Sequence, residues 1–421
     1  MKSAIKTKNI PTLRFPGFLP ARNASHSEAG GGEPDSAKAT TGSWEEKRLG
    51  EVAKFWNGKA HEQDISDNGK YIVVNSKFIS QNGKVKKYSD SQASPLKKDD
   101  IAIVMSDIPG GKAIGKCFLV DQDEKYTLNQ RIGGIKSKEI SSSFLIRILN
   151  RNKYFLKFDN GVSQTNLRKD EILRCPVVFP TLPEQQKIAG FLGAVDEWIE
   201  NLRAQKKSLA VYKKGMMQKI FAQELRFKDE SGKSFTEWEE KKLSNIFDIF
   251  AGKTKSLHIN GTGKNVIVDM GGISSDGKLI ANKYTDYSDD FLTTNDLVMP
   301  KDDIGGGMII GKVARIPENK KYICGDHIFK LTKKIGDVGF LFYAINSFNI
   351  SRSFRRKANG TAQLGLSKGS VENQKIPFPP IPEQQKIAEF LTSIDNLIES
   401  KQQQITQAEL WKKGLMQGLF V

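Results

Sequence analysis

The sequence predicts an α+β protein built from two strand-rich domains, each followed by one long helix, with the two helices pairing as an antiparallel coiled coil. Two observations carry this prediction. Residues 182–189 recur almost unchanged as residues 381–388, a displacement of 199 positions, so the 421-residue chain is a duplication. Each copy ends in a heptad pattern, which is typical of helices that pair. Pairing of two equivalent helices predicts a pseudo-twofold symmetry.

The repeated tail segments are the most regular part of the sequence. Leu182-Pro-Glu-Gln-Gln-Lys-Ile-Ala189 recurs as Ile381-Pro-Glu-Gln-Gln-Lys-Ile-Ala388, and the same displacement continues without a gap to the last residues. Upstream the similarity is weaker but colinear, as in Trp44-Glu-Glu-Lys47 and Trp238-Glu-Glu-Lys241. A period this long indicates a duplicated domain with its helix rather than a solenoid. The near-identity of the tails is expected if they meet equivalent partners.

Both tails have the features of a helix that begins at a proline and carries a coiled-coil seam. Pro183 and Pro382 occupy the first helical position, where a missing N–H costs little. Apolar residues then recur at alternating steps of four and three, and the seam residues are Ile188, Leu192, Val195, Ile199, Leu202, Ile387, Leu391, Ile394, Ile398 and Ile405. The period favours pairing of the helices, with separate packing of each helix on its own domain as the alternative. Gly215 and Gly414 interrupt the pattern, which indicates a close backbone approach or a helix end.

The segments before the tails read as mixed, strand-rich domains. Short apolar runs at 71–74, 101–105, 266–268 and 296–299 are bounded by Asn-Gly, Asp-Gly and Gly-Gly turn signals. Residues 19–43 lack large apolar side chains and are expected to be disordered. The expected organisation is an N-terminal segment at 1–43, a first domain at 44–182, a spacer helix at 183–225, a second domain at 226–381 and a spacer helix at 382–421.

Composition limits the classes of function. The chain carries 65 Lys and Arg against 48 Asp and Glu, a formal net charge of +17, which favours a polyanionic partner such as nucleic acid. No apolar run of membrane-spanning length and no secretory signal are visible, so a cytoplasmic location is expected. Cys117, Cys175 and Cys324 form no CxxC pair and the four histidines lack metal spacing, so neither disulfides nor a metal site is expected.

Loops that carry hydrogen-bond donors are candidates for DNA contacts, because Arg and Lys reach guanine and phosphates while Asn and Gln read adenine. Two such loops, Asn57-Gly-Lys-Ala-His61 and Ala251-Gly-Lys-Thr-Lys255, begin at equivalent positions and are both hinged on glycine. The candidate DNA-binding residues are Lys59, His61, Lys77, Lys86, Lys112, Gln130, Arg131, Lys253, Lys255, His258, Lys278, Lys283, His327 and Lys330. A solvated surface charge is the alternative for each of them.

A domain, a tail reading PEQQKIAxFL with a later KKGxMQ, a second domain and the same tail closely resemble the specificity subunits of type I restriction-modification systems. The resemblance covers the chain outside residues 19–43. It implies that residues 44–182 and 226–381 are target-recognition domains, each reading one half of a bipartite double-stranded DNA site. It also implies that the two helices set the spacing between the half-sites and dock methyltransferase subunits.

The same resemblance implies the partners and their cofactors. Two methyltransferase (modification) subunits would carry S-adenosylmethionine, and motor-nuclease restriction subunits would carry ATP and Mg. The chain itself would then be a non-catalytic subunit with no cofactor, metal or membrane partner of its own.

The sequence contains no recognisable catalytic motif. If the chain were itself a modification enzyme, it would be expected to carry the Asn/Asp-Pro-Pro-aromatic tetrad of amino-methyltransferases, and this tetrad is absent. Gly110-Gly-Lys-Ala-Ile-Gly-Lys116 and Gly306-Gly-Met-Ile-Ile-Gly-Lys312 match G-x-x-x-x-G-K, but Cys117 and Val313 follow where a nucleotide loop needs Ser or Thr. A turn that links strands or faces DNA is expected instead. A stand-alone bipartite DNA-binding regulator and an enzyme with an unrecognised site remain alternatives.

Overall fold

The protein divides into two compact units. Unit 1 comprises Met1–Asn201 and Ile405–Val421, and unit 2 comprises Leu202–Gln404. The computed structural model describes residues 11–18, 44–61, 63–108, 112–159, 161, 164–304, 306–360 and 363–420. The predicted disordered insert at 19–43 lies outside these residues. Each unit holds one predicted domain together with a part of both predicted helices, so the helices are shared between the units rather than forming domains of their own.

Domain 1 (residues 44–182) is built around a four-stranded antiparallel sheet in the order β2-β9-β5-β7. Its strands are β2 (Ala53–Asn57), β9 (Ile132–Ser137), β5 (Ile101–Val104) and β7 (Cys117–Leu119). The smaller sheets are β4 (Tyr88–Ser89) with β3 (Tyr71–Val74) and β8 (Tyr126–Leu128), β1 (Glu45–Arg48) with β11 (Pro176–Phe179), and β6 (Ser106–Asp107) with β10 (Thr165–Asn166). The helices are α1 (Leu49–Val52), α2 (Ser76–Ser80), α3 (Ser142–Leu149), α4 (Lys153–Leu156) and α5 (Lys169–Leu173).

Domain 2 (residues 226–381) repeats this plan strand for strand. Its four-stranded sheet runs β13 (Phe247–Ala251), β20 (Ile328–Lys333), β16 (Asp296–Pro300) and β18 (Ala314–Arg315). The smaller sheets are β15 (Lys283–Thr285) with β14 (Asn265–Val268) and β19 (Tyr322–Cys324), β12 (Glu239–Lys242) with β22 (Lys375–Phe378), and β17 (Asp302–Asp303) with β21 (Leu364–Gly365). The helices are α7 (Leu243–Ile246), α8 (Val338–Asn346), α9 (Phe348–Lys357) and α10 (Lys368–Glu372). The shared strand order confirms the duplication that the sequence predicts.

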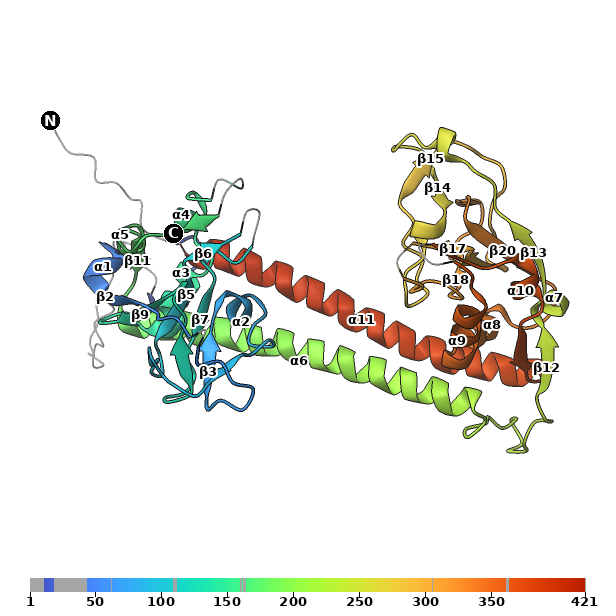
Figure 1. Ribbon diagram of the computed structural model, residues 1–421, viewed down its shortest axis with the longest axis horizontal. Helices are drawn as coiled ribbons and strands as arrows, with labels where there is room; N and C mark the ends of the chain where they lie inside the picture. Colours follow the sequence, from blue (N-terminus) through green and yellow to red (C-terminus); the bar gives the residue numbers. More distant parts are fainter. Residues whose placement is uncertain are drawn as a thin grey trace, which may run out of the picture. The chain divides into compact units, whose positions relative to one another are not determined.

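The two predicted tails form the long helices α6 (Leu182–Phe221) and α11 (Ile381–Leu419), shown in green and red in Figure 1. Within unit 2, the Nζ of Lys206 lies 2.5 Å from Gln402 Oε1 and the Nζ of Lys213 lies 2.6 Å from Asp395 Oδ1. The partner number falls as the helix number rises, so these segments run antiparallel. In unit 1, Asp196 pairs with Lys412, which is the same contact in the other copy.

The helix seam also completes the two domain cores. In unit 1, Ile188 and Leu192 at the start of α6 and Leu419 at the end of α11 belong to one buried cluster with the domain residues. In unit 2, Ile387 and Leu391 from α11 and Ile220 from α6 do the same. Nine of the ten seam residues are buried, and Ile398 is half-buried. Both predicted alternatives therefore hold at once, because each helix begins on its own domain and then pairs with the other helix.

At the start of each long helix, a buried carboxylate binds an arginine that precedes the first strand of the domain. Glu184 receives both Nε and Nη2 of Arg14, the latter at 2.6 Å, and Glu383 receives the same two atoms of Arg226. Glu383 also accepts the indole N–H of Trp238 at 2.9 Å. Both glutamates are at most 1% exposed.

The segment before each domain also bonds the end of a long helix. The amide of Leu13 donates to Gly418 O at 2.8 Å, and the amide of Leu225 donates to Lys219 O at 3.2 Å. Gly418 and Lys219 are counterparts at the displacement of 199. The N-terminal segment therefore meets the end of α11 in the way that the chain after α6 meets the end of α6.

The prediction for the two helical glycines is wrong. Gly215 and Gly414 lie inside α6 and α11, and a Cβ added at either position would meet nothing within 4 Å. Neither a close backbone approach nor a helix end explains them, and no other contact of the described residues does.

Candidate nucleic-acid interface

In domain 1 the glycine-hinged loop at 57–61 lies against the turn at 129–131. The amide of Gly58 donates to Ile132 O and the amide of Lys59 donates to Leu128 O, both at 3.0 Å. A Cβ at Gly58 would lie 2.1 Å from Asn129 O, closer than any side chain can approach. Glycine is therefore required here by the contact between two backbones.

Domain 2 contains the same arrangement. The amide of Gly252 donates to Ile328 O at 2.9 Å, and a Cβ at Gly252 would lie 1.8 Å from Gly325 O. The loop at 251–255 is thus held against the turn at 325–327. The sequence predicts these two loops to be equivalent, and their equivalence has a steric cause.

A third segment joins the same place in each domain. The amide of Met105 donates to Arg131 O at 3.1 Å, and the amide of its counterpart Lys301 donates to His327 O at 2.8 Å. These residues lead directly into β6 and β17, which pair with β10 and β21. We call residues 57–61, 106–108, 129–131 and 164–166 loop cluster 1, and residues 251–255, 302–304, 325–327 and 363–365 loop cluster 2.

The exposed side chains of the two clusters differ. The exposed polar side chains of loop cluster 1 are Asn57, Lys59, Gln130, Arg131, Gln164 and Asn166. Those of loop cluster 2 are Lys253, Thr254, His327 and Gln363, of which only Gln363 matches its counterpart, Gln164. The clusters also differ in charge, since cluster 1 has two cations and one carboxylate whereas cluster 2 has two cations and three carboxylates. Two domains with one backbone plan therefore offer different chemistry at the same place.

Two predicted DNA-binding residues need correction. His61 is 1% exposed, with Nδ1 2.8 Å from Lys59 O and Nε2 2.8 Å from Thr127 Oγ1. Lys255 is 6% exposed, and its Nζ lies 2.7 Å from Asp290 Oδ2. Both side chains are used inside their domain, where burial and internal partners leave no surface for a base or a phosphate.

The remaining predicted residues are spread over the domains. Lys77 follows Ser76, whose hydroxyl lies 3.5 Å from Ser106 O. Lys77 therefore lies beside loop cluster 1. Lys112 is exposed, and its carbonyl accepts Arg151 Nη1 at 3.1 Å. Lys86 lies in the loop before β4, and Lys283 lies on β15, where it pairs with Asp269.

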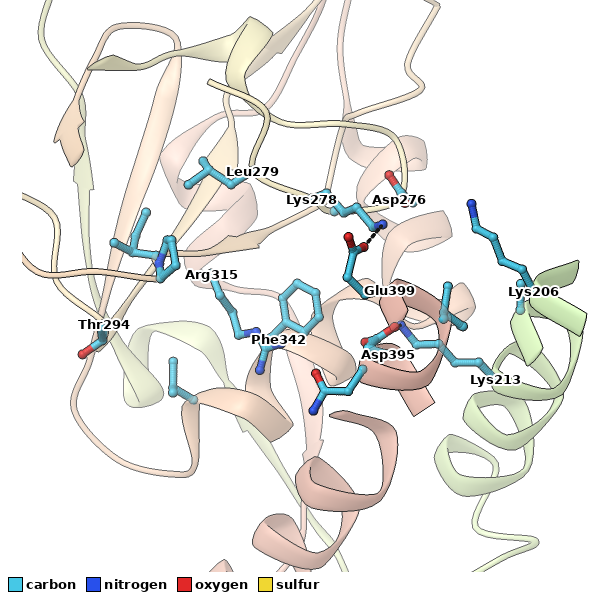
Figure 2. A pocket seen from close by; sticks show the side chains of 17 residues that line it. Lys206, Lys213, Asp276, Lys278, Leu279, Thr294, Arg315, Phe342, Asp395 and Glu399 are labelled. Atoms are coloured by element: carbon cyan, nitrogen blue, oxygen red, sulfur yellow. Dashed lines mark hydrogen bonds and ion pairs between the residues drawn. The ribbon is translucent and has the colours of Figure 1, made fainter. Parts of the chain in front are cut away.

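Three further predicted residues lie in unit 2 and have internal contacts. His258 stacks on Tyr287 with ring centroids 4.5 Å apart. Lys330 is half-buried, and its Nζ lies 3.5 Å from Asp296 Oδ2. Lys278 points toward α11, where its Nζ lies 3.9 Å from Glu399 Oε2 (Figure 2).

The glycine-rich strings that match a nucleotide loop are anchored by a carboxylate. Asp107 Oδ2 accepts the amides of Ala113 at 2.6 Å and Ile114 at 3.2 Å, and Asp303 Oδ2 accepts the amide of Ile309 at 2.9 Å. Residues 109–111 and 305 lie outside the described residues. Sequence reasoning did not assign this anchoring role, although the repeated Asp-Ile pair at 107 and 303 is a visible signal for it.

Unit 2 has a cavity of about 810 Å³ between domain 2 and the long helices (Figure 2). Its charged groups are mostly paired with one another. Asp395 accepts Lys213 Nζ at 2.6 Å and the hydroxyl of Tyr343 at 2.7 Å, while Arg315 lies 4.8 Å over the ring of Phe342. The side chains that line the cavity therefore connect domain 2 to the long helices, as at an internal packing junction.

The counterpart of this junction in unit 1 uses different donors on the same carboxylate position. Asp196 pairs with Arg147 of α3 and with Lys412 of α11. Burial acts to raise the pKa of Asp196, but the hydrogen bonds from Lys412 and Arg147 outweigh it and hold the pKa below its ordinary value.

An exposed aromatic patch lies on the helix pair of unit 1. Trp198 of α6 and Trp411 of α11 are 47% and 48% exposed, with ring centroids 6.4 Å apart, and Phe191 contacts Trp411 at 6.0 Å. Their counterparts in unit 2 at the displacement of 199 are Leu397 and Tyr212, which are also exposed. Large apolar side chains that remain exposed at matching positions are typical of protein interaction sites.

Two features are absent from the described residues. Within them, no helix is both long enough and apolar enough to cross a membrane. No group of three or more His, Cys, Asp or Glu side chains in this part of the chain is arranged to hold a metal ion.

Comparison with known proteins identifies similar sequences and folds. Residues 42–210 and 236–410 each match the model of the type I restriction modification DNA specificity domain. The MjaVIII specificity subunit of a type I restriction enzyme from Methanocaldococcus jannaschii is 29% identical, with 89% of this chain and 91% of that protein covered. The putative MjaX specificity subunit of a type I restriction enzyme from the same organism is 27% identical, with coverages of 89% and 92%.

Solved structures share the fold. The S subunit of a type I restriction-modification system from M. genitalium superposes with a TM-score of 0.59 at 16% identity, covering 98% of this chain and 99% of that one. A chain from a structure on complex assembly and conformational transition of the type I R-M system gives a TM-score of 0.54 at 17% identity, with coverages of 89% and 95%.

Proposed function

Because this chain belongs to the family of type I restriction modification DNA specificity domains, we propose that its two domains each read one half of a bipartite double-stranded DNA site. The observation that carries the proposal is the pair of loop clusters. Both are held by the same backbone contacts, through Gly58 and Gly252, yet they present different side chains. Two domains that share a backbone arrangement but expose different side chains are suited to bind two half-sites of different sequence.

The long helices are proposed to fix the spacing of the two half-sites. A helix of 40 residues such as α6 is about 60 Å long at 1.5 Å per residue, which spans one or more turns of duplex. Joining two weak half-site contacts through a stiff connection raises the affinity for sites with the matching spacing. The net charge of +17 supports binding to phosphates independently of sequence.

The chemistry is proposed to reside in partner subunits. Two methyltransferase subunits with S-adenosylmethionine would dock on the helix pair, and motor-nuclease subunits would supply ATP- and Mg-dependent restriction. The aromatic patch at Trp198 and Trp411, with its counterpart at Leu397 and Tyr212, supports two equivalent docking sites. This chain would then direct methylation without performing it.

The test is an exchange of residues 44–182 for the first domain of another family member, followed by methylome sequencing of cells that express the modification subunits. We expect one half of the methylated motif to change while the other half and the spacing stay the same. Exchange of residues 226–381 is the matched control and should change only the other half. A change in both halves from either exchange would contradict the proposal, as would DNA methylation by the purified chain alone.

A further inference from the structure

The residue at 131 in domain 1 and the residue at 327 in domain 2 occupy the same place in their loop clusters. The amide of Met105 binds the carbonyl of Arg131, and the amide of Lys301 binds the carbonyl of His327. Both side chains are exposed. One position therefore carries an arginine in one domain and a histidine in the other.

Arg131 offers only donors. A guanidinium carries five N–H groups and no acceptor, and it matches the O6 and N7 atoms of guanine in the major groove. Among the neutral polar groups of loop cluster 1, Ser106 accepts Gln164 Nε2 at 2.7 Å. Asp107, the one carboxylate of this cluster, is occupied by backbone amides. Arg131 can therefore act only as a hydrogen-bond donor.

The contacts of His327 give its ring the opposite role, that of a hydrogen-bond acceptor. Its Nδ1 lies 2.7 Å from Asp302 Oδ2, and because a carboxylate accepts, a neutral ring that makes this hydrogen bond carries its proton on Nδ1. Nε2 is then an acceptor, with Asp326 Oδ2, a second acceptor, 3.7 Å away. His327 also has a φ of +59°, a conformation that costs free energy for a residue other than glycine and that clusters at functional sites.

Two neighbouring acceptors fit an amino group better than a phosphate. The exocyclic amino group of cytosine N4 or adenine N6 offers donors in the major groove. A phosphate would instead meet the carboxylates of Asp302 and Asp326, and like charges repel. The surroundings of His327 therefore favour a base edge with a donor.

We infer that residues 131 and 327 each set the identity of one base in their half-sites, with opposite hydrogen-bonding polarity. Arg131 selects guanine, and His327 with Asp326 selects a base that carries an exocyclic amino group, cytosine or adenine. This inference rests on the proposed function, because it requires that the loop clusters face the major groove.

The test compares wild type, His327→Arg and Asp302→Asn as full chains in complex with their modification subunits, with methylome sequencing and methylation of oligonucleotide duplexes. Every Watson–Crick pair carries one exocyclic amino group in the major groove, so the wild-type motif is the reference against which the change in each variant is measured. His327→Arg should shift one position of the domain 2 half-site to guanine. Asp302→Asn puts an amide beside Nδ1 that can donate as well as accept, so the tautomer is no longer fixed and discrimination there should fall by about 5- to 150-fold.

The control is made in the other domain. Arg131→Ala should relax a guanine in the domain 1 half-site and leave the domain 2 half-site unchanged. If His327→Arg abolishes methylation, the Asp302→Asn variant tests the inference instead, because it keeps the histidine and hardly changes the side-chain volume at position 302. Unchanged selectivity at every base in that variant overturns the inference. A wild-type complex whose motif does not respond to domain exchange overturns the proposed function instead, so the two failures are distinguishable.

Discussion

The two units hold equivalent carboxylates in different ways. In unit 1, Asp196 is held by two cations, Arg147 from the domain and Lys412 from α11. In unit 2, Asp395 is held by Lys213 from α6 and by the hydroxyl of Tyr343 from the domain. The helix lysine is constant, whereas the domain donor changed from a guanidinium to a phenol. The junction therefore requires a donor at this place and not a particular charge.

Two kinds of contact nearer to the helix starts are the same in both units. Gln185 accepts the amide of Ser141, and Gln384 accepts the amide of Asp337, each at 2.8 Å. Glu184 and Glu383 each receive an arginine. The near-identity of the tails, which the sequence analysis attributes to equivalent partners, thus has an internal cause at these positions. Residues that lock a fold diverge less than residues at the loop clusters.

The largest expected effect is the loss of a buried carboxylate lock. Glu184→Ala leaves Arg14 buried without a counter-charge, and should lower the free energy of unfolding of unit 1 by about 3–5 kcal/mol. Glu383→Ala should also destabilise unit 2, because Trp238 loses its acceptor, but Arg226 is 20% exposed and keeps the carbonyls of Phe235 and Thr236 as acceptors. Denaturant unfolding combined with hydrogen exchange of each unit measures both effects. Equal loosening of both units by either variant would show that the locks are not local.

A smaller effect is expected at the helix junction. Asp196→Asn should destabilise by about 1–3 kcal/mol at pH 7, since it weakens two charged hydrogen bonds, and Asp395→Asn, facing one cation, should cost less. Because the pKa of Asp196 is lowered in the folded protein, its contribution is present above the unfolded value of about 3.9 and is lost as the pH falls through the folded value.

Unfolding of wild type and Asp196→Asn between pH 7 and pH 2.5 measures this contribution. The two stabilities should converge as the carboxyl becomes protonated. A difference that stays constant over this range would mean that the charge of Asp196 does not contribute.

The smallest expected effect tests the similarity of the two helices. Gly215→Ala and Gly414→Ala should each raise the free energy of unfolding by about 1 kcal/mol, because both sites are helical and open. Gly418→Ala is the matched control in α11. Its Cβ would lie 2.5 Å from Leu13 Cδ1, so the exposed Leu13 side chain must move and the gain should be smaller than at Gly215 or Gly414. Thermal unfolding compares the three variants, and a gain at Gly418 as large as at the other two would contradict the contact with Leu13.

The repeat and the periodicity were sufficient to predict the fold. The strands near 71–74, 101–105, 266–268 and 296–299 are present as β3, β5, β14 and β16, because alternation and turn signals are local properties. The sharing of each helix between two units could not be predicted, since a heptad seam looks the same whether it faces a helix or a domain core.

The site was predicted less well than the fold. The glycine-hinged loops were recognised, because a backbone contact that excludes every side chain leaves a glycine at the same place in both copies. His61 and Lys255 were misassigned, because the residues that bury them, Thr127 and Asp290, are distant in sequence. The loop clusters themselves form from four separate stretches, and only the folded chain brings these together.

The division into units also determines when each core can close during synthesis. Unit 2 leaves the ribosome as one continuous stretch, whereas unit 1 needs Ile405–Val421, which are made after all of unit 2. Leu419 is buried in the unit 1 core, with Leu415, Met416 and Phe420 packed against it. At about 5–20 residues per second, the first half waits about 10–40 s for them. The nascent chain therefore finishes its second half first, and the apolar surface of the first half is open to chaperones during that interval.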